Sequence, residues 1–387
     1  MLSFMKQLIL TKLWLSLKSG INLTLVGILF AVFIIEILTR VAPGLMPSAV
    51  KLHFHDDTYV LRGLLADDEI GVKYAPGLVN FSVPIIDDTG KWSSYPLSTV
   101  SLGYPGIGFK DDGLQGDPFA IVIGDSFTSC VGVKVEDCWV EVLEHQAGRD
   151  FANLGVESYG PQEEQRMLTR YGLPLKPKLV LWVFFANDPD DAWRFNMFGH
   201  GGITDGVFWQ SPIQTWLAAH SSTYMLSVFF WHNRHFIYNL LTDRQTTLTN
   251  EQQQIFRRSN LIWWKTITDM TSAQTIESVD LVEKALLAAH QQTTAAGAEF
   301  VVVIIPTREQ VYYVNTTLQA QLDALSKSLV EFCQENNIKA IDLTPSMRVQ
   351  AQTMPFMYFK QDLHLNPGGN TLVAELLNQE LAKFLIQ

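Results

Sequence analysis

The sequence predicts an α/β fold in which helices cover both faces of a parallel sheet, preceded by one N-terminal transmembrane helix. From Pro118 onward, short apolar runs alternate with segments of helical periodicity, the pattern of parallel strands joined by helices. The run Leu179–Phe185 is apolar at every position, as expected for a strand buried on both faces. Residues 20–38 form an apolar segment of about the length that crosses a bilayer.

Five strands and three longer helices are expected in the α/β part. The strands are predicted at residues 119–123, 151–154, 179–185, 299–305 and 338–343, and the helices at 279–296, 318–336 and 367–387. Gly297 suits a C-cap for the first helix. Asn366 and Pro367 supply an N-cap and a first-turn proline for the last. The segment from about 190 to 278 breaks this alternation, is rich in tryptophan, and is predicted to be a helical insertion.

These patterns divide the chain into four parts. We expect a cytoplasmic N-terminus (1–19), a transmembrane anchor (20–38), a juxtamembrane segment with short strands (39–117), and an α/β domain (118–387) that carries the insertion. Lys6, Lys12 and Lys18 precede the anchor, whereas Arg40 is the only basic residue close behind it. The positive-inside rule therefore predicts a single-pass protein of the cytoplasmic membrane with a periplasmic or extracellular domain. No clear signal-peptidase site follows the apolar segment, so an uncleaved anchor is favoured.

Charge and cysteine content narrow the class of protein. The 387 residues carry a formal net charge of −11, and binding to a phosphate backbone requires clustered lysine and arginine. Nucleic acid is therefore not an expected partner. Three cysteines are too few for a disulfide framework. Cys130 and Cys138 can pair if the domain is extracytoplasmic, whereas the alternative is that they and Cys333 are small buried side chains.

The strongest catalytic signal is Gly124-Asp125-Ser126-Phe127, directly after the first predicted strand. A strand that stops at Gly124 and a helix that begins at Ser126 place the hydroxyl at the carboxyl edge of the sheet, where open α/β sheets bind ligands. The Ser126 N–H then lies at a helix N-terminus and can stabilise negative charge. Alone, this tetrapeptide is common and more often marks an ordinary turn in which Ser126 caps a helix.

Further polar groups follow other strands in the order that a catalytic site requires. Gly155 ends the second strand and Asn187 the third, so both are expected at the same edge as donors for a tetrahedral oxyanion. Asp362 and His364 precede the last helix. Residues two apart in an extended segment project to one side, so Asp362 can orient His364 toward Ser126. Singly, these residues also suit a tight turn, a loop cap and a solvated histidine.

Together these blocks resemble those of the SGNH hydrolase superfamily, the GDSL-type esterases and lipases. The resemblance covers residues 118–387 and implies a three-layer αβα sandwich with a five-stranded parallel sheet. It implies that Ser126 is the nucleophile, that His364 is the base and that Asp362 orients the base. It further implies an oxyanion hole of Ser126, Gly155 and Asn187, with Asp125 and Asp188 in supporting positions.

Two departures from the family pattern bear on the subgroup. Only Leu363 separates Asp362 from His364, whereas the usual final block has two intervening residues. The shorter spacing is similar to that of the alginate-acetyltransferase-like branch and of anchored bacterial relatives, which include polysaccharide O-acetyltransferase and esterase proteins. Ala186 stands before Asn187, where many members have glycine, and its methyl group can narrow the oxyanion hole.

No metal and no cofactor are expected. His53 and His55 are expected to be solvated strand residues, because no third ligand is evident. The acidic cluster at residues 188–191 is expected to form a solvated loop. Arg308 follows the fourth strand and is a candidate substrate contact.

The sequence therefore predicts an extracytoplasmic serine esterase or O-acyltransferase, with acetyl as the favoured acyl group, that acts on a cell-surface polysaccharide, glycolipid or lipid ester. Ser126 would attack the acyl carbonyl, and water or an acceptor hydroxyl would resolve the acyl-enzyme. The expected partners are the acyl-ester substrate, the membrane and a membrane partner protein. The alternative is a non-catalytic glycan-binding or scaffold subunit of a membrane complex that retains the hydrolase fold. A thioesterase or protease is a third hypothesis.

Overall fold

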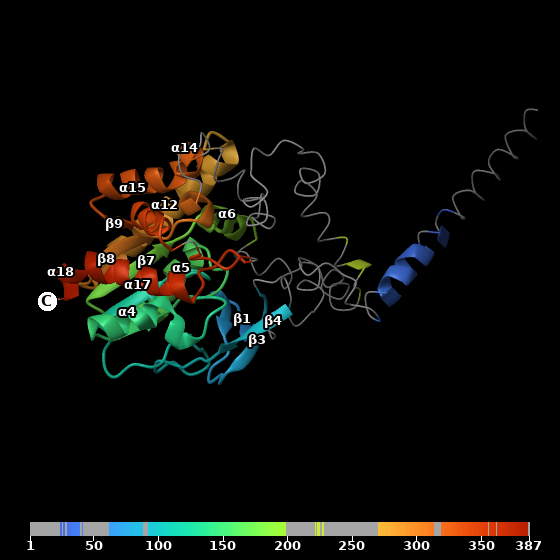
Figure 1. Ribbon diagram of the computed structural model, residues 1–387, viewed down its shortest axis with the longest axis horizontal. Coiled ribbons are helices and arrows are strands. Elements are labelled where there is room, and N and C mark those ends of the chain that lie inside the picture. The colour runs from blue at the N-terminus through green and yellow to red at the C-terminus, as the bar shows by residue number, and fades with distance from the viewer. Residues whose placement is uncertain are drawn as a thin grey trace, which may run out of the picture. The chain divides into compact units, whose positions relative to one another are not determined.

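The computed structural model describes residues 62–87, 92–198, 270–312, 319–354, 356–360 and 362–385, together with parts of 24–41 and 221–227. The chain separates into two compact units. The first comprises Met1–Thr58 and Trp209–Ile237, and the second comprises Tyr59–Phe208 and Tyr238–Gln387. The second unit carries the main sheet, and Figure 1 shows its strands enclosed between helices.

A five-stranded parallel sheet forms the centre of the second unit. Its strands are β5 (Ala120–Ile123), β6 (Phe151–Asn153), β7 (Leu179–Phe184), β8 (Glu299–Ile304) and β9 (Lys339–Asp342). They lie in the order β6-β5-β7-β8-β9, and every neighbouring pair is parallel. The predicted parallel sheet is thus confirmed. Ser126, Gly155 and Asn187 follow the carboxyl ends of three adjacent strands.

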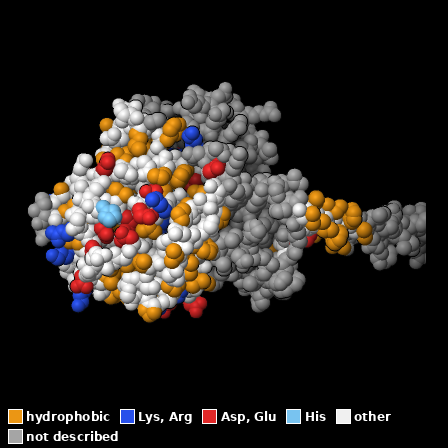
Figure 2. Space-filling view, turned by 60° about the horizontal axis from the view of Figure 1, so that its bottom comes forward, with side chains coloured by type: hydrophobic (Ala, Val, Ile, Leu, Met, Phe, Trp, Pro, Cys, Tyr) orange, Lys and Arg blue, Asp and Glu red, His pale blue; other side chains and the backbone are white. Residues whose placement is uncertain are grey.

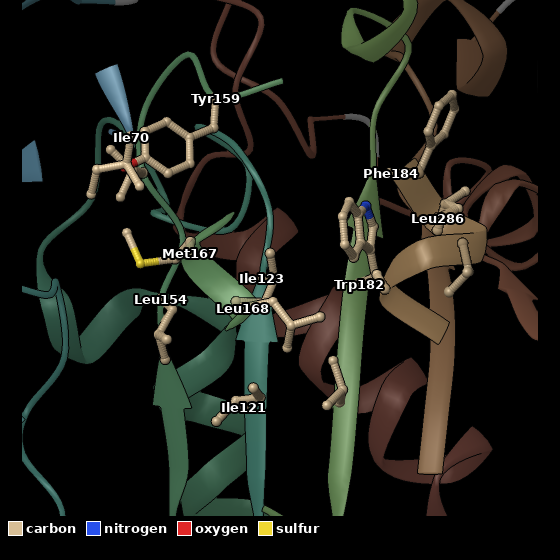
Figure 3. Packing of buried hydrophobic residues seen from close by; sticks show 14 of the residues in the cluster. Ile70, Ile121, Ile123, Leu154, Tyr159, Met167, Leu168, Trp182, Phe184 and Leu286 are labelled. Atoms are coloured by element: carbon tan, nitrogen blue, oxygen red, sulfur yellow. The ribbon is translucent and has the colours of Figure 1, made fainter. Parts of the chain in front are cut away.

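Alternation along the strands builds one core on each face of the sheet. On β7, Trp182 and Phe184 belong to one buried cluster and Leu181 and Val183 to the other, because successive side chains of a strand point to opposite faces. The first core packs against α5 (Pro161–Met167), α12 (Ala273–Ala295) and α15 (Ala324–Glu335), and Figure 3 shows Leu286 of α12 beside Trp182. The second core packs against α4 (Trp139–Ala147), α16 (Thr344–Gln350) and α17 (Pro367–Glu380). The fold is the three-layer αβα sandwich that the family resemblance implies.

Caps and ion pairs set several helix ends. Asn366 Oδ1 accepts the Gly369 N–H at 2.9 Å at the start of α17, and Gly297 follows α12 with φ +82°. The helix predicted at 318–336 is instead two helices, separated at Asp323, whose carboxylate pairs with Arg348 at 2.6 Å. The other helices described in this unit are η2 (Val135–Asp137), η3 (Leu168–Gly172), η4 (Leu173–Leu175), α6 (Asp188–Phe198), α13 (Arg308–Tyr312), α14 (Gln319–Leu322) and α18 (Ala382–Leu385).

Two antiparallel hairpins precede the main sheet. They are β1 (Leu64–Asp67) with β2 (Gly71–Tyr74), and β3 (Phe81–Ile86) with β4 (Trp92–Leu97). Leu64 and Tyr74 are buried in the first core. The Tyr159 hydroxyl, after β6, donates to the Val72 carbonyl at 2.6 Å. The hairpins therefore share a hydrophobic core with the sheet.

The first unit contains an apolar helical segment within residues 24–41. Its hydrophobic side chains, a type coloured orange in Figure 2, are exposed, with Phe30 at 62% and Phe33 at 60%. Glu36 accepts hydrogen bonds from the backbone N–H and the hydroxyl of Thr223, both at 2.9 Å. Among the described residues, no helix combines the length and the apolar character needed to span a bilayer, so the anchor at 20–38 stays a prediction. Most of the insertion predicted at 190–278 lies outside the described residues.

Candidate active site

Ser126 lies in a tight turn directly after β5. Asp125 shapes this turn (residues 124–132, called the nucleophile turn after the role predicted for Ser126), because its carboxylate accepts the Phe127 N–H at 2.8 Å and its carbonyl accepts the Thr128 N–H at 3.1 Å. Glycine is required at position 124, where a Cβ would lie 2.1 Å from Thr128 Oγ1. The Ser126 hydroxyl stands 3.4 Å from Asp125 Oδ2, and 8% of the residue is exposed.

The prediction that a helix begins at Ser126 is wrong. Residues 126–131 form turns, and regular helix resumes only at Val135–Asp137 and α4. Cys130 has φ +51° and Gly132 has φ +93°, conformations that a right-handed helix excludes. The Ser126 N–H has no acceptor among the described residues, so it remains available to an oxyanion although no helix begins there.

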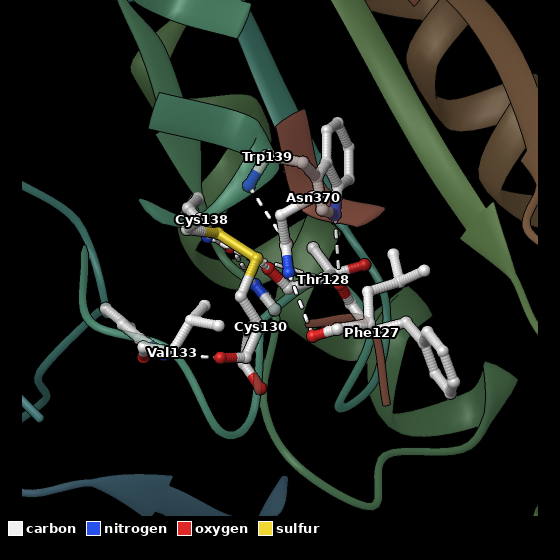
Figure 4. The surroundings of a disulfide bond; sticks show 12 residues. Phe127, Thr128, Cys130, Val133, Cys138, Trp139 and Asn370 are labelled. Carbon is white, nitrogen blue, oxygen red and sulfur yellow. Dashed lines mark hydrogen bonds between the residues drawn. A yellow bond between two sulfur atoms is a disulfide. The ribbon is translucent and has the colours of Figure 1, made fainter. Parts of the chain in front are cut away.

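A disulfide joins Cys130 to Cys138, whose Cα atoms are 5.4 Å apart, as Figure 4 shows. The indole N–H of Trp139, the next residue, donates to the Phe127 carbonyl at 2.9 Å. Of the two alternatives for the cysteines, the paired one is present, and Cys333 is a buried thiol. The nucleophile turn is thereby fastened to the first residues of α4.

Gly155 follows β6 and packs against the nucleophile turn. A Cβ on Gly155 would lie 2.5 Å from Thr128 Cβ and 2.7 Å from the Ser129 nitrogen, so a larger residue does not fit. The Gly155 N–H donates to Asn153 Oδ1 at 3.0 Å, and Asn153 Nδ2 donates to the Thr128 carbonyl at 3.0 Å. Our sequence interpretation missed this structural role of Asn153. The available signal was a polar residue within an otherwise apolar strand.

Asn187 reaches the nucleophile turn from the end of β7. Its Nδ2 donates to Asp125 Oδ2 at 3.1 Å and to Asp191 Oδ2 at 2.8 Å. Both amide hydrogens therefore have carboxylate acceptors, whereas Asn187 Oδ1 is buried and has no partner among the described residues. The structure brings Asn187 beside Asp125 and Ser126, but in this state its donors serve two acids.

Buried carboxyl groups surround Asn187. Asp188 and Asp191 lie in the first turn of α6 and are 0% and 5% exposed, so the predicted solvated loop is wrong at these positions. Asp188 Oδ2 accepts the Phe185 N–H at 3.3 Å, which supports the turn after β7. Burial raises the pKa of Asp188, Asp191 and Glu164 well above their ordinary values, and neighbouring carboxylates raise those of Asp188 and Glu164 further. Burial therefore favours the protonated form of these groups.

Asp362 and His364 form a hydrogen-bonded pair in the loop before α17. His364 Nδ1 is bonded to Asp362 Oδ1, and the same oxygen accepts the His364 backbone N–H at 2.9 Å. Burial acts to raise the pKa of Asp362, but the charge of His364 and its hydrogen bonds lower it to about 2. The imidazole lies against Phe127, with ring centroids 5.0 Å apart. Its Nε2 is buried and lacks a partner within the described part of the chain.

Arg308 holds the loop that carries this pair. One guanidinium nitrogen, Nη1, lies 3.4 Å from the carbonyl oxygen of Phe359, 3.5 Å from that of Lys360 and 3.2 Å from that of Asp362. Its Nε lies 3.3 Å from Glu309 Oε1. The Arg308 side chain is 2% exposed. We predicted a substrate contact, but the structure buries this cation beneath the loop, where it positions the backbone around Asp362.

A nucleophile turn, an Asp–His pair and an αβα sandwich define a hydrolase of the SGNH class. The family model described as "GDSL-like Lipase/Acylhydrolase family" matches residues 122–372, which is more than half of the chain. The chain therefore belongs to this family, and it is a serine hydrolase of the kind that acts on ester bonds. No curated protein sequence matches the chain.

Several solved structures are similar at low identity. An acetyl xylan esterase, AlAXEase, is 13% identical with a TM-score of 0.39, over 68% of this chain and 98% of that one. The acetylxylan esterase Axe2 from Geobacillus stearothermophilus is 11% identical with a TM-score of 0.39, over 69% and 94%. A member of the lipolytic protein G-D-S-L family from Veillonella parvula is 13% identical with a TM-score of 0.37, over 68% and 96%.

The sequence candidates for a metal site at His53 and His55 lie outside the described residues.

Proposed function

We propose that this chain is a membrane-anchored, extracytoplasmic serine esterase or O-acetyltransferase that acts on an acylated cell-surface polysaccharide, glycolipid or lipid through Ser126, His364 and Asp362. One observation carries the proposal. His364 is held at Nδ1 by Asp362, while its buried Nε2 has no partner among the described residues and its ring packs on Phe127, the neighbour of Ser126. An imidazole held in this way has the orientation that a general base needs, which supports the proposed role, and its Nε2 makes no hydrogen bond to the Ser126 hydroxyl in this structure.

The proposed mechanism begins when His364 Nε2 accepts the Ser126 hydroxyl proton as Ser126 Oγ attacks the acyl carbonyl. Asp362 has a pKa of about 2, so it stays ionised and stabilises the imidazolium. The leaving alcohol takes the proton from His364, and water or an acceptor hydroxyl then releases the acyl group. The Ser126 N–H is one oxyanion donor. Asn187 and Gly155 become donors only if the amide of each releases its present acceptor.

Three features support the proposed location and substrate class. The apolar segment 20–38 follows three lysines, which favours a cytoplasmic N-terminus. The Cys130–Cys138 disulfide suits an oxidising compartment such as the periplasm. The single residue between Asp362 and His364 is similar to the spacing in anchored polysaccharide acetyltransferase-like proteins.

The test is active-site labelling of the full chain, purified in detergent, with a fluorophosphonate probe, together with hydrolysis of an aryl acetate. Ser126→Ala and His364→Ala are expected to lower turnover by about 10³-fold or more, and Ser126→Ala abolishes labelling. Ser129→Ala is the matched control, because Ser129 is buried in the same turn and is expected to keep both activities. Absence of Ser126-dependent labelling and turnover in the unsubstituted chain would contradict an enzymatic role. Adding glycan acceptors then separates transfer from hydrolysis by the fate of the acetyl group.

A second candidate function is a non-catalytic glycan-binding subunit. The observation that favours it is the occupancy of the predicted oxyanion donors, because the Gly155 N–H and both Asn187 amide hydrogens already have internal acceptors. In that case acetylated glycans bind without turnover, and Ser126→Ala leaves their affinity unchanged. Calorimetric titration of an acetylated oligosaccharide into both proteins measures this directly.

A further inference from the structure

Three carboxylates that the proposed chemistry does not use converge beside the edge of the sheet. Asp111 and Asp112 lie in the segment that precedes β5, and Glu141 lies in the first turn of α4. One oxygen from each of the three side chains lies within 4.8 Å of the other two. Asp112 is exposed, whereas Asp111 is 2% and Glu141 is 1% exposed. The cluster is therefore deeply set but open to solvent at one member.

Glu141 is the member that indicates a missing ligand. Both of its carboxylate oxygens are buried and accept no hydrogen bond from a donor among the described residues, and the group that faces them is the carboxyl of Asp112. A carboxylate removed from water without donors is strongly unfavourable unless a cation or a proton compensates it. Glu141 is therefore a buried carboxyl group whose two oxygens lack a donor or a cation, and it lies beside Asp111 and Asp112.

The neighbouring groups do not meet this need. The buried Lys110 ammonium donates to the carbonyl oxygens of Cys130 and Val133, both at 2.6 Å, and makes no hydrogen bond to Glu141. Glu144 adds negative charge on the same side of α4. Asp111 has its own partners, because its two oxygens accept the N–H groups of Gly113 at 2.7 Å and Asn153 at 2.8 Å. A carboxylate oxygen that accepts one hydrogen bond still has a lone pair for a metal ion.

We propose that Asp111, Asp112 and Glu141 bind a divalent cation, and that the cation is Ca²⁺. Oxygen-only ligands suit a hard cation, and the absence of histidine and thiolate from the cluster disfavours zinc. Ca²⁺ holds its oxygens at roughly 2.3–2.6 Å, so ligands around one ion stand at most about 5 Å apart, and the three oxygens meet this condition because they all lie within 4.8 Å of one another. The exposed Asp112 leaves room for waters to complete a flexible coordination shell.

A cation here would join three parts of the second unit. Glu141 belongs to α4, and Asp111 to the segment before β5. Asp111 also holds the backbone of Asn153 on the edge strand β6, and Asn153 in turn binds the nucleophile turn through Thr128. Binding would stabilise the folded chain, because the carboxylates are brought together only on folding. The role is structural, so the inference does not depend on the proposed catalytic function.

The experiment uses the full chain in detergent, stripped with EDTA and dialysed, then supplied with CaCl₂ or with NaCl of equal ionic strength. A saturating excess of Ca²⁺ is expected to raise the thermal unfolding midpoint by about 5 °C or more, and calorimetry should show one bound ion. Asp112→Asn removes an exposed ligand without disturbing the core and should abolish this rise. Asp117→Asn, an exposed carboxylate of the same segment, is the matched control and should keep it.

Glu141→Gln separates a lost site from a folding defect. The amide keeps the shape of Glu141 and cannot ionise, so in EDTA this variant is expected to be at least as stable as the unsubstituted chain, and it should not respond to Ca²⁺. The inference is overturned if Ca²⁺ neither binds to the unsubstituted chain nor raises its midpoint. It is equally overturned if the rise persists in both Asp112→Asn and Glu141→Gln.

Discussion

The nucleophile turn and the base loop (residues 356–360 and 362–366) supply the two halves of the candidate active site, but they are held in different ways. The nucleophile turn is closed by its own backbone hydrogen bonds, fastened by the Cys130–Cys138 disulfide, and buried against Gly155. The base loop is closed by one short ladder, in which the Phe359 N–H donates to the His364 carbonyl at 2.9 Å. Arg308, which lies in α13, also contacts the backbone carbonyl oxygens of three residues of this loop.

This difference separates stability from catalytic alignment. Side chains in the nucleophile turn are nearly enclosed, with Ser126 8% exposed, whereas the Asp362 side chain keeps 28% exposure. We therefore expect damage to the turn to weaken the whole fold. Damage to the supports of the base loop should mainly misplace His364 while the chain stays folded. Four substitutions test this contrast.

The largest effect is expected for Asp362→Asn, which should lower kcat by about 10²–10⁴-fold because an amide favours the wrong imidazole tautomer. The pKa of Asp362 in the folded chain, about 2, lies below the ordinary value of 3.8, so ionised Asp362 stabilises the fold above about pH 4 and this contribution is lost as the pH falls toward 2. The stability difference from Asp362→Asn should be about 2 kcal/mol near pH 5 and shrink in acid. Chemical unfolding at several pH values measures it, and a pH-independent difference would contradict the pairing.

Arg308→Met should lower kcat by about 10- to 100-fold, because the base loop loses the cation that fixes the carbonyls around Asp362. Arg308→Lys should recover part of this loss, since an ammonium can still bind one or two carbonyls. KM is expected to change little, because the Arg308 side chain is only 2% exposed. The matched control is Arg348→Met, which breaks the pair with Asp323 and should lower stability with kcat retained. Equal effects of the two methionine variants on kcat would refute a positioning role for Arg308.

The double variant Cys130→Ser/Cys138→Ser should lower the free energy of unfolding by about 2–3 kcal/mol, since a disulfide between residues eight apart restricts the unfolded chain. Reductant should have the same effect on the unsubstituted chain. Cys333→Ala is the control, because the Cys333 thiol forms no disulfide. Reductant should lower the stability of this variant by the same amount as that of the unsubstituted chain. Unfolding in denaturant, with and without reductant, provides the measurement. A base loop variant such as Arg308→Lys should stay sensitive to reductant.

The smallest effect is expected for Glu164→Gln, which tests the buried acids beneath Asn187. Burial and neighbouring carboxylates raise the pKa of Glu164 well above its ordinary value of 4.5. Above pH 4.5 the folded chain therefore binds more protons than the unfolded chain, and its stability falls as the pH rises toward the raised pKa. A neutral amide removes that loss. The thermal unfolding midpoint of the variant should equal that of the unsubstituted chain near pH 4.5 and lie a few degrees higher at alkaline pH. The same midpoint difference at every pH would show that Glu164 does not titrate on unfolding.

Much of the architecture was predictable because it depends on local patterns. The apolar run Leu179–Phe185 could be assigned to a buried strand without knowing its neighbours, and β7 occupies residues 179–184. Asn366 and Pro367 marked the start of α17 for the same reason. The helix predicted at Ser126 failed because Cys130 adopts a left-handed conformation within the disulfide loop. That conformation was not evident from the local periodicity.

In the candidate site, too, local motifs predicted the residues but not their hydrogen-bond partners. Ser126, Gly155, Asn187, Asp362 and His364 could be selected from motifs and their order, since each follows a strand or precedes a helix. Their hydrogen-bond partners could not, because these come from distant segments. Asn187 binds Asp125, 62 positions away, and Arg308 reaches the carbonyl of Asp362, 54 positions away. The spacing of residues along the sequence does not give the distances between these side chains or the extent of their burial.

The sequence alone determined the parallel sheet, the chemical groups at its carboxyl edge and the apolar N-terminal segment, because side-chain alternation and motif order are local properties. Only the tertiary structure decided that Arg308 is buried against the carbonyls of the base loop, that Cys130 pairs with Cys138, and that Glu141 is buried without a donor. These facts depend on which distant groups share a low-dielectric interior. Folding sets that environment, and with it the protonation and bonding of each group.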